Sequence, residues 1–202
     1  RGAIKRKVPD KKRLSQIQQL CYSIDDDIRW LVALLSDTGM RLSEAAGLIT
    51  DDVQLDQEVP FIYLRSHRWR GLKTPNSERQ IPLIGAAHWA ANRCLNNSSL
   101  GSGRFLFPRY CNLNQCKSDY ASNTLNKWLK KYVDGGYVLH SLRHSFRDRL
   151  RGEGCPSEVI DQICGWKHPG VGVTYGSGFK LSVLQMEMKK IELNIFAKPL
   201  SH

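Results

Sequence analysis

The segment from residue 139 to residue 150 constrains the fold of this chain more than any other. Its apolar residues recur every three or four positions, which is the period of an α-helix: Leu139, Leu142, Phe146 and Leu150. Four cationic or proton-donating residues share that spacing on the adjacent face: His140, Arg143, His144 and Arg147. The segment is therefore predicted to form a helix that buries one stripe and presents a positive edge beside it. Such an edge suits an anionic ligand, although His and Arg on a helix are more often simply solvated.

Downstream of this helix the chain leads to Tyr175. The run Cys155-Pro156-Ser157-Glu158 begins another short helix, with proline at an early position where its missing N–H costs little. Gly165 ends that helix, and Trp166 follows it nine positions before Tyr175. Tyr175 itself lies among glycines and other small residues. A phenol in that setting can reach a bound group instead of filling the core.

The rest of the chain predicts an α+β fold that is mainly α-helical, with a small antiparallel β-sheet. Periodic apolar positions predict helices over residues 14–21, 26–35, 44–48, 84–95, 118–132 and 181–196. Two runs rich in strand-forming residues, 60–65 and 79–83, are predicted to be strands. Turn-forming residues around 71–77 indicate that a hairpin joins them.

Two cationic residues are expected in connections between these elements. Thr38-Gly39 breaks one helix and Ser43 is the expected N-cap of the next, which leaves Arg41 in the tight turn between them. A turn holds an arginine more firmly than a loop does; the alternatives are a surface position or an ion pair with Glu44. Lys73 is expected at a strand end or in the following turn, where most lysines are merely solvated.

The charge of the chain favours a polyanionic partner. The formal net charge is +11 and the pI is near 9.5, and many Lys and Arg gain by displacing counterions from phosphates. Acidic lipid is the competing partner, but no basic amphipathic helix with a large apolar face supports it, so nucleic acid is favoured. No apolar run is long enough to span a bilayer, and the basic residues 1–13 precede no apolar segment. We therefore expect a cytoplasmic protein without signal peptide or membrane anchor.

The six cysteines lack the paired CxxC spacing of a zinc site, and a chain of 202 residues does not need disulfides to support its core. We therefore expect reduced thiols, several of them in the core. A metal site built on Cys111 and Cys116 is the alternative that we set aside. No metal and no cofactor is expected.

Four motifs, in a fixed order, resemble those of one known family. They are Thr38-Gly39-Met40-Arg41-Leu42-Ser43-Glu44; Leu72-Lys73-Thr74 followed by Arg79-Gln80-Ile81-Pro82-Leu83; His140-Ser141-Leu142-Arg143-His144; and Gly165-Trp166, nine residues ahead of Tyr175. Each motif alone is weak, whereas the ordered set is specific. Over nearly its whole length the chain resembles the catalytic domain of the tyrosine recombinases, the lambda-type phage and prophage integrase family. The resemblance implies that residues 13–202 form this catalytic domain, including a C-terminal docking helix, and that residues 1–12 are a basic linker from an upstream DNA-binding module.

The resemblance and the residue types together imply a reaction in which a tyrosine attacks a DNA phosphodiester. Tyr175 is the implied nucleophile, and its 3′-phosphotyrosine product keeps the bond energy, so that rejoining needs neither ATP nor metal. Arg41 and Arg143 suit the phosphate oxygens, because a planar guanidinium donates two parallel hydrogen bonds and stays charged. Trp166 occupies a position that holds His in most members and Trp in some. Its indole N–H adds one donor but no acid–base capacity.

Proton transfer is assigned to two other residues. Lys73 is the implied general acid for the departing 5′ oxygen, and His140 the general base or an orienting donor near Tyr175. His168 lies two residues beyond Trp166 and resembles the family histidine, but the spacing to Tyr175 favours Trp166.

Other basic side chains are candidates for contacts to backbone phosphates: Arg65, Arg68, Arg70, His144, Arg147 and His168. The implied partner is double-stranded DNA at attachment sites. The family resemblance also implies a tetrameric synapse formed through the C-terminal helix, and host or phage directionality factors. The implied function is site-specific recombination at the bacterial nucleoid, for integration and excision of a phage or mobile element. The alternatives are DNA relaxation of the type IB topoisomerase kind and a DNA-binding module without activity.

Overall fold

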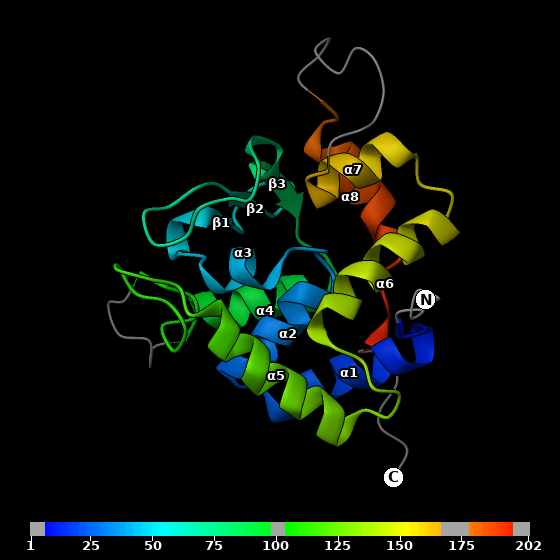
Figure 1. The fold of residues 1–202 in the computed structure, drawn as a ribbon. Coiled ribbons are helices and arrows are strands. Elements are labelled where there is room, and N and C mark those ends of the chain that lie inside the picture. Colours follow the sequence, from blue (N-terminus) through cyan, green and yellow to red (C-terminus); the bar gives the residue numbers. More distant parts are fainter. Residues whose placement is uncertain (1–6, 98–103, 167–177, 196–202) are drawn as a thin grey trace, which may run out of the picture.

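A small sheet lies at one side of a group of helices in the computed structural model, which describes residues 7–97, 104–166 and 178–195 (Figure 1). The helices are α1 (Lys11–Ile24), α2 (Asp27–Ser36), α3 (Leu42–Ala46), α4 (Gly85–Leu95), α5 (Ser118–Tyr132), α6 (Leu139–Gly152), α7 (Ser157–Cys164) and α8 (Leu181–Lys189). Short 3₁₀ turns cover Thr50–Asp52 and Pro75–Ser77. The mainly helical α+β class expected from the sequence is confirmed.

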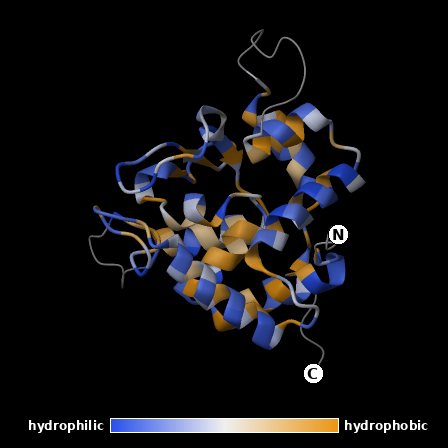
Figure 2. Ribbon diagram, in the orientation of Figure 1, coloured by the Kyte–Doolittle hydropathy of each residue, from blue (hydrophilic) through white to orange (hydrophobic). Residues whose placement is uncertain are grey.

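Helix α2 forms the centre of the core, because its apolar residues are not confined to one face. Every residue from Trp30 to Ser36 is buried. Helices α1, α4 and α6 pack against α2, and Figure 2 shows the hydrophobic colouring concentrated at the centre, on α2 and α4. A helix that is apolar on all sides has to be enclosed. The end of α2 is therefore held firmly, and the turn that contains Arg41 starts directly after it.

The sheet is antiparallel, with the strand order β1-β2-β3. Its strands are β1 (Val53–Gln54), β2 (Phe61–Leu64) and β3 (Arg79–Pro82), and Leu64 of β2 is paired with Arg79 of β3. Alternate residues of β2 are buried, as expected for a strand with one face on the core. The two strands predicted from the sequence are confirmed. The additional strand β1 has two residues, too few to show an alternating pattern.

Several helix ends differ from the expected ones, and α1, for example, covers Lys11–Ile24 instead of residues 14–21. Helix α3 begins at Leu42, with Arg41 as its N-cap, so the prediction of Ser43 as the cap is wrong. The carboxylate of Glu44, the third residue of the helix, accepts the Arg41 main-chain N–H at 2.9 Å, as in one half of a capping box. The last helix ends at Lys189, not near residue 196. Its apolar pattern continues because Ile191, in the turn that follows, is also buried.

The described end of the expected linker lies on the folded domain. Helix α1 begins at Lys11, and the side chain of Asp10 caps it by accepting the Arg13 main-chain N–H at 2.8 Å. The Ser145 hydroxyl of α6 donates to the Pro9 carbonyl oxygen at 3.2 Å. Residues 9–12 are therefore attached to the domain by α1 and α6.

Cys111 and Cys116 form a disulfide, so the expectation of reduced thiols is wrong for this pair. An isolated antiparallel bridge pairs the two residues, with their Cα atoms 4.2 Å apart, and their spacing in the sequence does not reveal this. The other four cysteines are free and buried: Cys21, Cys94, Cys155 and Cys164. Burial raises the pKa of the Cys155 and Cys164 thiols to about 11, so both keep their protons at neutral pH.

In the part of the chain that the structure describes, no three His, Cys, Asp or Glu side chains are grouped so that they could hold a metal ion. None of the helices in the same ranges is long and apolar enough to cross a bilayer.

Candidate active site

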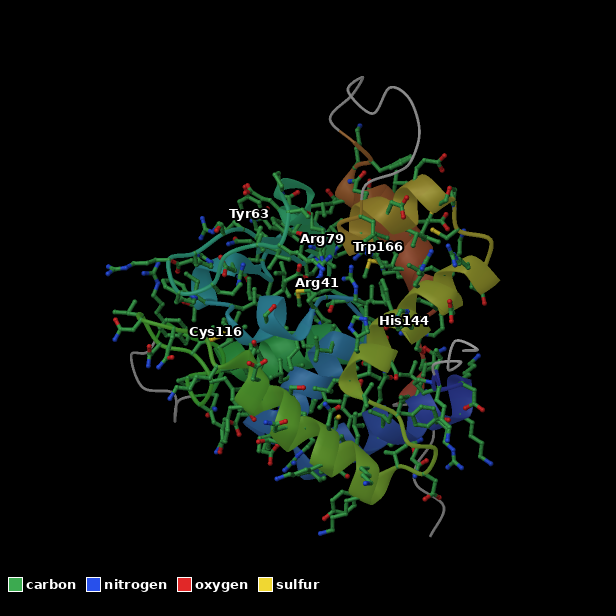
Figure 3. All side chains as sticks on the ribbon, in the orientation of Figure 1. Arg41, Tyr63, Arg79, Cys116, His144 and Trp166 are labelled. Carbon is green, nitrogen blue, oxygen red and sulfur yellow. A yellow bond between two sulfur atoms is a disulfide. The ribbon has the colours of Figure 1, made fainter. Side chains whose placement is uncertain are left out.

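Four separate parts of the chain meet beside the sheet. They are the α2–α3 turn, the β2–β3 connection, the N-terminal half of α6, and the residues that end α7. Side-chain hydrogen bonds join them over long sequence separations, and Figure 3 shows Arg41, Arg79 and Trp166 gathered where they meet. Each of the four motifs singled out in the sequence contributes to this place, which we call the arginine cluster and define by Arg41, Arg79, Arg143 and Arg147.

Arg41 is held at the start of α3 by Glu44. The Arg41 Nη1 donates to Glu44 Oε1 at 2.7 Å, and Ser77 Oγ lies 3.4 Å from the same nitrogen. The ion pair with Glu44, one of the alternatives left open by the sequence, is therefore present. Among the described residues these contacts occupy Nη1 alone, and 23% of the side chain is exposed. The Nε and Nη2 groups of Arg41 therefore have donors to offer to an anion.

Glu44 joins Arg41 to a second arginine, Arg79 of β3. The Glu44 side chain is 3% exposed, and its Oε2 accepts from Arg79 Nη2 at 3.1 Å. Burial by itself would raise the pKa of Glu44, but the charge of Arg79 and the hydrogen bonds from both arginines outweigh it, and the pKa lies below its ordinary value. Glu44 is therefore an ionised carboxylate between two guanidinium groups.

The sequence reasoning did not single out Arg79, although one signal was present. Arg79 and Ile81 share the inward face of β3, because they are two residues apart, and both are buried. An arginine at an inward-facing strand position needs a buried partner. Here the partner is Glu44, which the sequence offered only as a neighbour of Arg41.

Arg143 is 4% exposed and lies under the turn that contains Arg41. Its Nη1 donates to the Gly39 carbonyl oxygen and its Nη2 to the Cys164 carbonyl oxygen, the latter at 2.8 Å. Burial lowers the pKa of Arg143 to about 10, which still leaves it charged at neutral pH. Gly39 has φ +64°, and a Cβ on it would lie 2.5 Å from the ring of Phe146, so only glycine fits at this turn.

Trp166, directly after α7, has two guanidinium groups against its ring. The Cζ of Arg143 is 4.8 Å and that of Arg147 is 4.6 Å from the centroid of its ring. These distances are those of cation–π contacts. The helix ends at Gly165 in the left-handed conformation, φ +68°, which turns the chain so that Trp166 faces α6.

His140 and His144 occupy the same edge of α6. Their rings meet edge to face with centroids 4.8 Å apart, and His140 is exposed while His144 is half-buried. Arg143 and His140 also line a cavity of about 370 Å³ between α2, α5 and α6. Of the positive edge predicted for this helix, Arg143 is buried, whereas His140 is exposed and His144 and Arg147 are half-buried.

Lys73 lies in the connection between β2 and β3, and its side chain is exposed. The next residue, Thr74, has its hydroxyl 3.0 Å from Ser77 Oγ, and Ser77 also faces Arg41. The part of the β2–β3 connection that follows Lys73 is therefore attached to the arginine cluster.

The three other arginines predicted to contact DNA lie in the same β2–β3 connection but have different surroundings. Arg65 donates from Nε to the buried Asp52 at 3.0 Å and is 38% exposed, while Arg68 is exposed. Arg70 is 5% exposed and donates to the Arg65 carbonyl oxygen at 2.6 Å, so it supports the loop from inside. Arg104, which the sequence reasoning did not single out, lies over the ring of Trp69 beside this loop and is 51% exposed.

Two predicted site residues, Tyr175 and His168, lie outside the described residues. Their roles therefore stay predictions from the sequence.

Known proteins resemble this chain over most of its length. The model of the phage integrase family matches residues 9–177. The transposase from transposon Tn916 of Enterococcus faecalis is 26% identical over 180 residues, which cover 79% of this chain and 44% of the transposase. The tyrosine recombinase XerD of Corynebacterium glutamicum is 31% identical over 190 residues, which cover 85% of this chain and 57% of that protein. The chain thus spans about half the length of these relatives.

Solved structures share the fold. The crystal structure of XerA recombinase has a TM-score of 0.64 at 17% identity and covers 93% of this chain and 60% of its own. The Tn1549 transposon integrase, solved in complex with transposon right end DNA, has a TM-score of 0.63 at 18% identity and covers 93% of this chain and 67% of its own. With a family model spanning residues 9–177 and a fold shared with two recombinases, this chain belongs to the phage integrase family of tyrosine recombinases.

Proposed function

We propose that the protein is a site-specific DNA recombinase that cleaves and rejoins DNA strands through a 3′-phosphotyrosine intermediate, without metal or ATP. The observation that carries this proposal is that Arg41, Arg143 and Trp166 are gathered at one place with the part of the β2–β3 connection that follows Lys73. These groups belong to four motifs that are far apart in the sequence. Hydrogen bonds that involve Glu44, Ser77 and the end of α7 bring them together. A cluster of guanidinium groups beside proton donors is what a phosphoryl transfer needs.

In the proposed reaction the phenolic oxygen of Tyr175 forms a bond to the scissile phosphorus, and the bond from phosphorus to the 5′ oxygen breaks. The phenol proton passes to His140 and the 5′ oxygen takes a proton from Lys73. Arg41 and Arg143 stabilise the charge that builds on the other phosphate oxygens, helped by the Trp166 N–H. Attack of a 5′ hydroxyl on the phosphotyrosine reverses these steps and rejoins the strand.

The partners of this reaction are also proposals. Solved relatives support DNA: the Tn1549 integrase holds transposon right end DNA, XerH is bound to difH substrate, and a lambda integrase dimer is bound to a core site. We propose that protomers assemble as a tetramer on attachment-site DNA in the bacterial cytoplasm, with directionality factors choosing between integration and excision. The exposed apolar side chains of Phe179, just before α8, and of Met186, on α8, support a contact to a neighbouring protomer. In the same proposal residues 1–12 connect the catalytic domain to an upstream DNA-binding module.

A suicide substrate tests the proposed function. The natural protein is incubated in EDTA with duplex DNA nicked next to a candidate crossover site, and covalent adducts are mapped after denaturing electrophoresis. We expect a 3′-phosphate joined to Tyr175. Adduct on any sequence together with relaxation of supercoiled plasmid favours the topoisomerase alternative, and DNA binding with no adduct on any substrate favours the inactive module.

We expect Lys73→Ala to slow cleavage by roughly 100- to 10,000-fold, the range for loss of a general acid. A substrate with sulfur in place of the bridging 5′ oxygen has a leaving group that needs no proton. It should therefore restore most of the rate in Lys73→Ala and change the wild-type rate little. The measurement is the single-turnover rate of adduct formation on both substrates. A variant that stays slow on the sulfur substrate would remove Lys73 from the role of acid.

We expect Arg68→Ala to weaken DNA binding equally on specific and random sequences, and to reduce the slope of log affinity against log salt by about one unit. The reason is that an exposed guanidinium that neutralises one phosphate releases its counterion. Arg93→Ala is the matched control, because Arg93 is also exposed but lies on α4 in an ion pair with Asp25. Titrations of fluorescent duplexes at several salt concentrations measure both slopes. Equal slopes for Arg68→Ala and the wild type would take Arg68 out of the DNA contact.

A further inference from the structure

We infer that Arg79 is a positioning residue of the strand-cleavage reaction, acting through Glu44 on Arg41 while joining the Lys73 connection to the end of α7. The inference rests on the proposed function and adds a residue that touches no substrate. It is carried by the hydrogen bonds of one buried side chain, which reach three of the four parts of the site.

All three nitrogens of the Arg79 guanidinium are used inside the protein. The Nε donates to the Ile163 carbonyl oxygen at 2.7 Å, Nη1 to the Ser77 carbonyl oxygen at 2.6 Å, and Nη2 to Glu44 Oε2 at 3.1 Å. The residue is 7% exposed, and Gly165 leaves room for it, since a Cβ there would lie 2.8 Å from Arg79 Nη1. Arg79 is therefore placed to hold other groups, not to bind DNA.

The link from Arg79 to Arg41 passes through a shared carboxylate. The two oxygens of Glu44 accept hydrogen bonds from different groups. Oε1 accepts from the Arg41 side chain, and Oε2 accepts from both the Arg41 main-chain N–H and the Arg79 side chain. With Arg79 charged, Glu44 has two counterions. Without the Arg79 hydrogen bond to Oε2, the buried carboxylate would depend on Arg41 alone, and the Arg41 guanidinium would be drawn toward Glu44 and away from a phosphate.

The link from Arg79 to the other parts of the site passes through main-chain oxygens. Arg79 and Arg143 bind the consecutive carbonyl oxygens of Ile163 and Cys164, at the negative end of α7. Together they hold the turn from which Trp166 extends. Arg79 also donates to the Ser77 carbonyl oxygen. The Ser77 hydroxyl in turn lies against Arg41 and against Thr74, the residue that follows Lys73.

Arg79→Lys tests the inference, because an ammonium keeps the charge but cannot reach three acceptors in different directions. We expect single-turnover cleavage of the suicide substrate to fall by roughly 100-fold, the scale for a misplaced reacting group. The affinity for DNA should stay near the wild-type value, since Arg79 is not exposed to DNA.

Arg149→Lys is the matched control for lost stability. The Arg149 guanidinium also joins a buried carboxylate, Asp37 at 3.1 Å, to main-chain oxygens, those of Ile191 and Ser36, but it lies in the last turn of α6 and has no contact with the arginine cluster in the described structure. We expect it to lower the unfolding temperature about as much as Arg79→Lys does, yet to keep the cleavage rate of its folded fraction.

A double-mutant cycle separates positioning from general damage. If Arg79 acts through Arg41, adding Arg79→Lys to Arg41→Lys should reduce cleavage much less than it does in the wild type. Additive losses, or a wild-type rate in Arg79→Lys, would overturn the inference while the wild-type adduct leaves the proposed function intact. Equal rate losses in Arg79→Lys and Arg149→Lys would likewise reduce Arg79 to a structural residue. Absence of any adduct with the wild type would instead overturn the proposed function, and the inference with it.

Discussion

Tyr175→Phe is expected to abolish the covalent protein–DNA adduct while leaving DNA binding unchanged. The substitution removes only the phenolic oxygen, which is the atom proposed to bond to phosphorus, so no slower route to the same intermediate remains. The protein is incubated with the suicide substrate and the adduct is measured on a denaturing gel, while binding is measured in parallel by titration.

Tyr132→Phe is the matched control for this experiment, because Tyr132 is an exposed tyrosine at the end of α5 and has no role in the proposed chemistry. It should form adduct at the wild-type rate. Adduct that persists in Tyr175→Phe would mean that another residue is the nucleophile, and peptide mapping of that adduct would identify it.

Arg143→Lys is expected to lose both cleavage and stability. The cleavage rate should fall by roughly 100- to 1,000-fold, the scale for removing one donor that stabilises developing charge. The stability loss follows from geometry, because the Gly39 and Cys164 carbonyl oxygens both accept from this one guanidinium. One ammonium cannot reach both acceptors, and a buried acceptor left without a donor costs about 1–3 kcal/mol.

Single-turnover cleavage and thermal unfolding measure the two losses separately. Assaying Arg143→Lys well below its unfolding temperature restores the folded fraction but should not restore the rate. Arg147→Lys is the comparison, since Arg147 lies against the same Trp166 ring at 4.6 Å but has no hydrogen bond to either of these two carbonyl oxygens. We expect Arg147→Lys to stay near wild-type stability. A wild-type cleavage rate in folded Arg143→Lys would show that the guanidinium serves the fold alone.

Several local features that the sequence predicted are present in the structure. The spacing in α6 predicted a buried stripe beside a positive edge, and both are present. Helix α7 ends at Gly165, as the sequence indicated, and Trp166 follows it. These features are local. A helix repeats every 3.6 residues, so the pattern of apolar and polar residues over a few turns shows which face is buried.

Other features could not be found this way. Arg70 resembled Arg65 and Arg68 in sequence, but it is buried, whereas Arg65 is half-buried and Arg68 is exposed. The pairing of Cys111 with Cys116 depends on a bridge between two short segments with no strand pattern. The predicted last helix was too long, because Ile191, which lies in the turn after α8, is buried and continues the apolar pattern of the helix.

The sequence by itself determined the class of the fold, the faces of its main helices and the four motifs that supply the proposed chemistry. Only the tertiary structure decided which of these groups are connected. Arg79 contacts Ile163, 84 positions away, and Arg143 contacts Gly39, 104 positions away. Periodicity and turn chemistry act over a few residues, whereas these contacts form only when packing around α2 and the sheet brings distant segments together. The same packing excludes water from Arg143, which lowers its pKa, and places Arg79 against Glu44, whose pKa falls because the charge of Arg79 and the hydrogen bonds from Arg79 and Arg41 outweigh the effect of burial.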